Sequence, residues 1–143
     1  MAEHRTATID VDASAEELFE IVVDIENYPD WVQGVTGVEI HGRNDDGYPL
    51  QATMTVDAGV KTFTYRLEYD YDFPGLVSWK SVSGDLKQID GSYGFDVNDE
   101  GGTTITYELM IDPGFRIPGF MVRQAQKAIM SAALDGLKDR AES

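Results

Sequence analysis

Aromatic hydroxyls on segments that alternate with a period of two are the most abundant chemically useful side chains in this sequence. Tyr65, Tyr69, Trp79, Tyr93 and Tyr107 fall on such segments, which we expect to be neighbouring strands. A phenol hydroxyl donates and accepts hydrogen bonds, and it needs a partner when it is buried. These residues therefore belong either to a packed core or to a solvated or ligand-filled cavity, and the residues alone leave both interpretations open.

The sequence contains few side chains that could bind a metal ion or act as a nucleophile. The chain has no cysteine and only two histidines, His4 and His41, which excludes thiolate sites and three-histidine metal sites. A run that begins at Asp96 resembles the start of a calcium loop, but Tyr107 stands where the closing glutamate is required. We therefore expect no metal ion and no cofactor.

Acidic side chains dominate the charge. The 143 residues include 11 basic and 26 acidic ones, a formal net charge of −15 at pH 7 that disfavours nucleic acid. Residues 116–143 differ, because they carry 5 basic and 3 acidic side chains. The start has no signal-peptide pattern and no stretch approaches 18 apolar residues. We expect one cytoplasmic domain covering residues 1–143, with no nucleic-acid partner.

The N-terminal elements are indicated by local patterns. Residues 4–11 alternate as a half-buried strand does. Ser14 with Glu17 three residues later forms a capping-box pattern, so a helix should follow. Pro29 predicts that this helix stops before it, with at most a short second helical turn beyond.

The remaining chain divides into six strands and one helix. Residues 35–112 alternate with a period of two between closely spaced turns, which is typical of an antiparallel meander. From about Pro118 to Asp139 the period becomes 3.6, as in an amphipathic helix. Its apolar stripe consists of Val122, Ala125, Ile129, Ala132 and Gly136. Small residues in that stripe indicate either close packing on the sheet or space left for a ligand.

Several segments carry a family resemblance. Residues 17–31, ELFEIVVDIENYPDW, resemble the N-terminal signature of START-like (SRPBCC) polyketide cyclase/dehydrase and coenzyme Q-binding proteins. The segments similar to later parts of the family are 35–39 (VTGVE), 78–80 (SWK), 90–93 (DGSY), 103–107 (TTITY) and 137–142 (LKDRAE). The resemblance spans nearly the whole chain in the same element order.

This resemblance implies an α+β helix-grip fold. A curved antiparallel sheet of about seven strands wraps a long C-terminal helix in that fold, with two short helices after the first strand. An apolar cavity is implied between sheet and helix, and we expect a volume of roughly several hundred Å³. The expected lining residues are Trp31, Met54, Tyr65, Tyr69, Trp79, Tyr93, Tyr107, Met121, Ala125, Ile129 and Ala132.

The resemblance also bears on activity. The family's aromatase/cyclases are proposed to use an arginine on the long central strand. Here Arg66 alternates with Tyr65 and Leu67, so it should point away from the cavity, and the family's arginine position falls near Tyr69. We therefore expect a protein that binds a lipid, quinone or polyketide-like molecule as a carrier or ligand-binding protein.

Two other functions remain open. One is a polyketide aromatase/cyclase or dehydratase that uses Tyr69, Tyr93 or Tyr107 as a proton donor. The other is an interaction protein whose cavity has collapsed.

Residues 115–121, FRIPGFM, place apolar side chains in a connection that is usually polar. We expect either a mobile rim at the cavity entrance or a hydrophobic staple that fixes the start of the last helix. A rim next to Arg116 and Arg123 predicts transient contact with a membrane surface.

Overall fold

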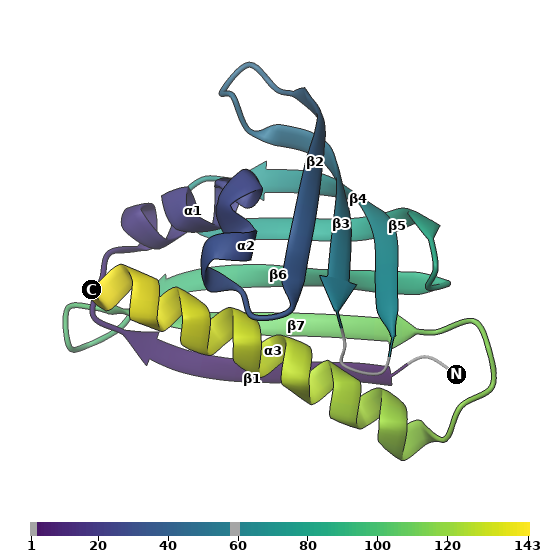
Figure 1. Ribbon diagram of the computed structural model, residues 1–143. Coiled ribbons are helices and arrows are strands. Elements are labelled where there is room, and N and C mark those ends of the chain that lie inside the picture. Colours follow the sequence, from purple (N-terminus) through teal and green to yellow (C-terminus); the bar gives the residue numbers. More distant parts are fainter. Residues whose placement is uncertain (1–2, 58–60) are drawn as a thin grey trace.

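Seven antiparallel strands form one strongly curved sheet in the computed structural model, which describes residues 3–57 and 61–143 (Figure 1). The strands are β1 (Glu3–Val11), β2 (Val35–Arg43), β3 (Pro49–Asp57), β4 (Thr62–Asp72), β5 (Leu76–Gly84), β6 (Gln88–Val97) and β7 (Thr103–Asp112). They lie side by side in the order β1-β7-β6-β5-β4-β3-β2, so consecutive strands pair from β2 to β7 and β1 joins β7. The expected α+β helix-grip architecture is confirmed.

The helices lie on one face of this sheet. They are α1 (Ala15–Val23), the 3₁₀ turn η1 (Ile25–Asn27), α2 (Tyr28–Trp31) and α3 (Gly119–Glu142). The predicted cap is present, because Ser14 Oγ accepts a hydrogen bond from the Glu17 N–H at 3.1 Å. In the described part of the chain, no helix combines the length and the apolar character needed to span a bilayer.

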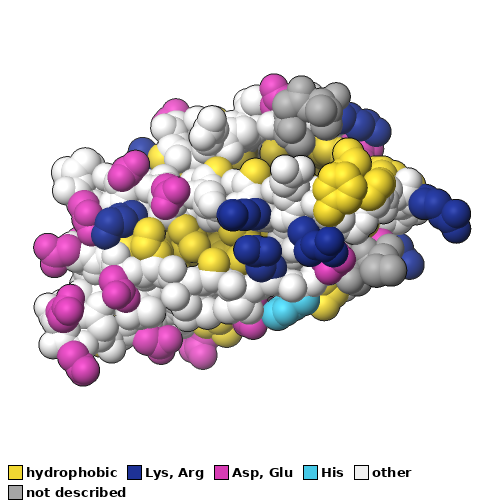
Figure 2. Space-filling view, turned by 90° about the horizontal axis from the view of Figure 1, so that it is seen from below, with side chains coloured by type: hydrophobic (Ala, Val, Ile, Leu, Met, Phe, Trp, Pro, Cys, Tyr) yellow, Lys and Arg dark blue, Asp and Glu magenta, His cyan; other side chains and the backbone are white. Residues whose placement is uncertain are grey.

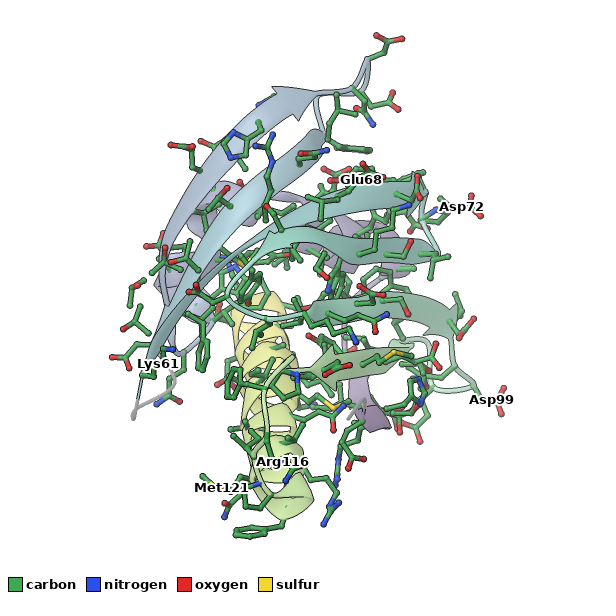
Figure 3. All side chains as sticks on the ribbon, turned by 90° about the vertical axis from the view of Figure 1, so that its right-hand side faces the viewer. Lys61, Glu68, Asp72, Asp99, Arg116 and Met121 are labelled. Carbon is green, nitrogen blue, oxygen red and sulfur yellow. The ribbon has the colours of Figure 1, made fainter. Side chains whose placement is uncertain are left out.

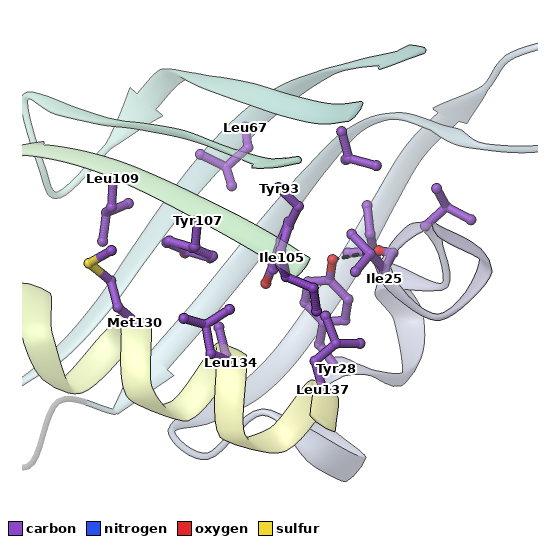
Figure 4. Close-up of a cluster of buried hydrophobic side chains, with 14 of the residues drawn as sticks. Ile25, Tyr28, Leu67, Tyr93, Ile105, Tyr107, Leu109, Met130, Leu134 and Leu137 are labelled. Carbon is purple, nitrogen blue, oxygen red and sulfur yellow. Dashed lines mark hydrogen bonds between the residues drawn. The ribbon is translucent and has the colours of Figure 1, made fainter. Parts of the chain in front are cut away.

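The C-terminal half of α3 is closely packed. Leu134 and Leu137 point from α3 toward the sheet and meet Ile105 of β7 and Ile25 of η1 (Figure 4). Ile25, Ile105 and Leu137 have no exposed surface at all. We call this cluster, formed by Ile25, Ile105, Leu134 and Leu137, the packed end of the molecule.

The buried face of α3 is rotated from the predicted one. The buried residues are Val122, Gln126, Met130, Ala133, Leu134 and Leu137. Gln126 can be buried because its side-chain amide donates to the carbonyl oxygens of Leu109 at 2.7 Å and Glu3 at 2.9 Å. Gly136 serves another purpose, since a Cβ there would lie 2.3 Å from the Trp31 carbonyl oxygen. The small residue thus permits close contact between α2 and α3.

Strands β5 and β6 pair over only part of their length. Their ladder runs from Leu76 opposite Gly94 to Trp79 opposite Gly91. Beyond it the strands are joined through side chains: Asp90 Oδ1 accepts from the Ser81 N–H at 3.0 Å, and Ser81 Oγ accepts from the Ile89 N–H at 3.1 Å. We call this part of the sheet the β5–β6 seam.

Candidate functional site

A cavity of about 70 Å³ lies between the sheet and the first half of α3. We call it the inner chamber. Its lining residues are Tyr28, Val32, Gln33, Val35, Met54, Val56, Tyr65, Leu67, Tyr69, Trp79, Ile89, Tyr93, Tyr107, Leu109, Ile129 and Ala133. The volume is smaller than the several hundred Å³ expected, because aromatic rings project into the space and contact one another.

Those rings form a continuous aromatic wall. Tyr93 and Tyr107 face each other across β6 and β7, with ring centroids 4.8 Å apart and planes perpendicular. Trp79 lies 5.5 Å from Tyr93 and 5.7 Å from Tyr107, and Tyr69 lies 6.4 Å from Trp79. Two of these pairs, Trp79–Tyr107 and Tyr93–Tyr107, are edge-to-face and the other two are tilted, and the edge-to-face geometry is favourable for aromatic rings.

A glycine makes room for the indole of Trp79. Gly91 is the register partner of Trp79 across β5 and β6. A Cβ on Gly91 would lie 2.6 Å from Cζ2 of Trp79 and 2.5 Å from the carbonyl oxygen of Glu108. Only glycine at this position therefore lets the indole lie against β6 at the edge of the chamber.

The tyrosine hydroxyls fall into two groups. Tyr28 donates to the Val22 carbonyl oxygen at 2.5 Å, and Tyr71 donates to the Pro49 carbonyl oxygen at 2.6 Å. Within the described residues, the four chamber hydroxyls without a protein hydrogen-bond partner are those of Tyr65, Tyr69, Tyr93 and Tyr107. These hydroxyls belong to buried residues that line the inner chamber and are each only 3% or 6% exposed. They are polar groups that an occupant of the chamber can satisfy.

Burial keeps these hydroxyls protonated. Desolvation is the largest cause that raises the pKa of Tyr65, Tyr69, Tyr93 and Tyr107 above the ordinary value, and neighbouring tyrosines raise it further for Tyr69, Tyr93 and Tyr107. The neutral phenol is a good hydrogen-bond donor, but it gives up its proton less readily than a solvated tyrosine does. The chamber is therefore better suited to holding an oxygen atom than to protonating one.

No lysine, arginine, histidine, aspartate or glutamate is among the described residues that line the inner chamber. Arg66 lies on the outer face of the sheet, as its alternation predicts, and its Nε donates to Gln51 Oε1 at 2.6 Å. Among the described residues, no group of three or more histidine, aspartate or glutamate side chains is arranged to hold a metal ion. The chamber offers an occupant apolar surface and neutral hydrogen-bonding groups.

A second cavity of about 80 Å³ adjoins the first, and we call it the outer chamber. Its lining residues are Val56, Phe63, Tyr65, Leu86, Ile89, Ile111, Pro113, Phe115, Ile117, Val122, Ala125 and Ile129. It lies between the ends of β3, β4 and β7 and the start of α3. Four residues, Val56, Tyr65, Ile89 and Ile129, line both chambers.

Exposed apolar side chains lie beside the outer chamber. Phe115, Phe120 and Met121 expose 47%, 61% and 46% of their surface. Figure 2, which views the molecule from below, shows a group of hydrophobic side chains at its right-hand end with lysine and arginine side chains near them. Arg116 and Met121 lie together at the end of the molecule where α3 begins (Figure 3). We call Phe115, Arg116, Phe120 and Met121 the rim.

The structure places most of the expected lining residues around the inner chamber. Those that line it are Met54, Tyr65, Tyr69, Trp79, Tyr93, Tyr107 and Ile129. Four others lie elsewhere. Ala125 lines the outer chamber only, and Met121 is exposed on the rim. Ala132 and Trp31 line neither chamber, because α3 is rotated and Trp31 packs against Tyr28 and Gly136.

Several lining residues were missed in the sequence. Ile89 and Leu109 share strand faces with Tyr93 and Tyr107, so the period of two already contained the signal for them. Ala133 belongs to the small residues that the helical pattern predicts on the inward side of α3, but so does Ala128, which is exposed, because alanine is compatible with either face. Tyr28 carried no such signal, since it precedes Pro29 in a helix of only four residues.

A curved sheet that wraps a long helix over an apolar, aromatic-lined cavity defines a helix-grip fold. The chain belongs to the polyketide cyclase/dehydrase and lipid transport family, whose model matches residues 11–138.

Solved structures share this fold. A START superfamily protein from Mycobacterium smegmatis is 24% identical with a TM-score of 0.88, and the match covers 97% of each chain. The Zhui aromatase/cyclase from Streptomyces sp. R1128 is 18% identical with a TM-score of 0.82 over 99% of this chain and 94% of that one. At these identities the likeness establishes the fold alone.

A curated relative is similar in sequence. The persistence and stress-resistance toxin PasT of Escherichia coli O6:H1 is 32% identical over 100 residues, which are 67% of this chain. The chain spans about 60% of the length of that relative.

Proposed function

We propose that this protein binds an apolar or aromatic small molecule, such as a lipid, a quinone or a polyketide-like metabolite, and acts as its carrier or ligand-binding protein. The observation that carries this proposal is a set of four tyrosine hydroxyls that have no partner among the described residues and lie on a mostly apolar wall. A dry core leaves such groups at a cost of about 1–3 kcal/mol each. An occupant with an apolar body and an oxygen atom removes that cost.

The test compares two substitutions of alanine on the same helix. Ala133 is buried and lines the inner chamber, whereas Ala128 is exposed. Ala133→Phe should fill the chamber and abolish binding of the neutral dye N-phenyl-1-naphthylamine, and Ala128→Phe should bind it as the wild type does. Native mass spectrometry of the freshly purified wild type should show a bound small molecule that Ala133→Phe lacks.

Overpacking of a core costs about 1–3 kcal/mol, so the larger side chain could unfold the protein. Circular dichroism and thermal unfolding test whether Ala133→Phe is folded. Wild-type dye affinity in a folded Ala133→Phe protein would refute the proposal. If that variant does not fold, the smaller Ala133→Val replaces it and should weaken dye binding.

The alternative function is a polyketide cyclase or dehydratase that uses Tyr69, Tyr93 or Tyr107 as a proton donor. Family membership favours it, whereas the raised pKa values of the tyrosines and the lack of a charged side chain among the described lining residues favour binding. Cyclisation of a poly-β-ketone substrate that is lost in Tyr107→Phe, with dye binding retained, would establish the enzymatic function instead.

We also propose transient contact with membranes through the rim. Its support is the exposure of Phe115, Phe120 and Met121 next to the exposed Arg116. Arg123 contributes less charge than the sequence suggested, because its Nη1 pairs with Glu3 Oε1 at 3.1 Å. The rim therefore offers apolar side chains and one cation to a lipid surface.

A further inference from the structure

The two chambers adjoin each other and differ in chemistry. Val56, Tyr65, Ile89 and Ile129 border both chambers, so an elongated molecule that occupies both would pass between these four side chains. Neither chamber alone holds more than a small head group, since each has a volume of only about 70 or 80 Å³.

Depth distinguishes the two ends. The inner chamber is walled mainly by buried strand residues such as Tyr93 and Tyr107, each 3% exposed, although the exposed Gln33 also borders it. The outer chamber is walled partly by Phe115 and Ala125, which are exposed to solvent. A molecule that occupies both chambers therefore has its leading end among the tyrosines and its trailing end at the rim.

Polarity distinguishes them as well. The hydroxyls of Tyr69, Tyr93 and Tyr107 belong to the inner chamber alone, and Tyr65 stands at the junction. Apart from that shared tyrosine, every described residue that lines the outer chamber is apolar. Hydrogen bonding is thus available at the deep end, and the path toward solvent is apolar.

The lining of the inner chamber also restricts the charge of the ligand group that can enter it. No described lysine, arginine or histidine lines either chamber, so a carboxylate there would lack a counter-charge. Burial of an unpaired ionised group is far more costly than burial of a neutral hydrogen-bonding group. The inner chamber accordingly discriminates against anions.

We infer that the ligand is a neutral, elongated amphiphile that binds head first, with a carbonyl, hydroxyl or phenol group among the inner tyrosines and an aliphatic chain in the outer chamber. This inference rests on the proposed function and adds to it a ligand class and an orientation. On the same grounds, the carboxylate of an ionised fatty acid is disfavoured among the inner tyrosines.

Fluorescence quenching by bromine tests the orientation. The chain has two tryptophans, and Trp79 lines only the inner chamber, so Trp31→Phe leaves a single reporter there. Two probes differ only in the position of bromine: 2-bromo-4-octylphenol carries it on the head and 4-(8-bromooctyl)phenol on the tail. At saturation, the head-labelled probe should quench Trp79 more strongly. Stronger quenching by the tail-labelled probe would overturn the orientation.

Affinities test the head group. Methyl decanoate should bind at least about tenfold more tightly than decanoate at pH 7, because only the ester is neutral. Tyr93→Phe should weaken 4-octylphenol about fivefold through the loss of one hydrogen bond. Equal binding of ester and carboxylate would overturn the neutral head. Failure of every probe and of N-phenyl-1-naphthylamine would instead refute the proposed binding function itself.

Discussion

The two halves of α3 cover the same sheet with opposite results. At the packed end, Leu134 and Leu137 meet Ile25 and Ile105 with almost no exposed surface. Nearer the start of α3, at what we call the hollow end, Ile129 borders both chambers and Ala133 borders the tyrosine-lined inner chamber. The backbone architecture is shared, so side-chain shape makes the difference. Branched aliphatic side chains interdigitate, whereas rigid rings on neighbouring strands contact each other and leave space between them.

Alkaline pH should distinguish the two ends most strongly. Burial raises the pKa of the hollow-end tyrosines above the ordinary value near 10, so the unfolded chain loses these protons first. Their contribution to stability is complete below pH about 10 and is lost as pH rises toward the folded-state pKa. Absorbance at 295 nm and circular dichroism should therefore change together, in one unfolding transition.

The control for this titration lies at the packed end. Leu134→Ala should lower the free energy of unfolding by a similar amount at pH 7 and pH 10, because leucine does not titrate. Tyr107→Phe should instead make stability less dependent on pH. Full phenolate absorbance near pH 10 in a folded protein would show that the hollow end is open to water.

Truncation of a side chain to alanine should lower the free energy of unfolding far more at the packed end than at the hollow end. Leu137 has no exposed surface, and Leu137→Ala should lower the free energy of unfolding by about 2–5 kcal/mol. Ile129→Ala should cost about 1 kcal/mol, because Ile129 is only half-buried and already borders open space. Urea unfolding measures both, and equal losses would mean that the hollow end is packed.

Removal of single hydroxyls sharpens the comparison. The Tyr28 hydroxyl donates a hydrogen bond to the Val22 carbonyl oxygen. Tyr28→Phe removes that hydrogen bond and should lower the free energy of unfolding by about 1 kcal/mol. Tyr93→Phe should not lower the free energy of unfolding, because its hydroxyl has no hydrogen-bond partner among the described residues. A large loss of stability in ligand-free Tyr93→Phe would contradict this assignment.

The smallest effect should appear at the rim. Arg116→Glu should reduce co-sedimentation with anionic vesicles, and the difference from wild type should shrink as salt rises. Arg140→Glu is the matched control, since Arg140 is also exposed but lies at the far end of α3. Thermal stability should be unchanged in both variants. Equal, salt-independent sedimentation of all three proteins would show that Arg116 does not contribute to membrane binding.

The elements and most of the aromatic wall could be predicted because they depend on local periodicity. The alternation of Tyr65, Tyr69, Tyr93 and Tyr107 places each on the concave face whatever the strands pack against. The capping box at Ser14 is equally local. Such signals do not depend on distant parts of the chain.

The rotation of α3 could not be predicted in this way. Alanine and glycine are compatible with both faces of a helix, so the stripe through Ala125 and Ala132 was ambiguous. The true face is set by tertiary contacts: Gln126 bonds to Glu3 and Leu109, and Gly136 admits Trp31. A buried glutamine cannot be recognised until its partners are known. The cavity volume depends in the same way on how rings from different strands meet.

The β5–β6 seam is the part of the sheet beside the inner chamber where neighbouring strands share the fewest backbone pairs. Most neighbouring strands in this sheet are joined by longer ladders of backbone hydrogen bonds, whereas past Trp79 and Gly91 the two strands are held by Ser81 and Asp90 side chains. Spreading the sheet there stretches a few side-chain contacts and leaves the backbone ladders intact. We therefore expect the sheet to separate more easily at the β5–β6 seam, beside the inner chamber, than at the packed end.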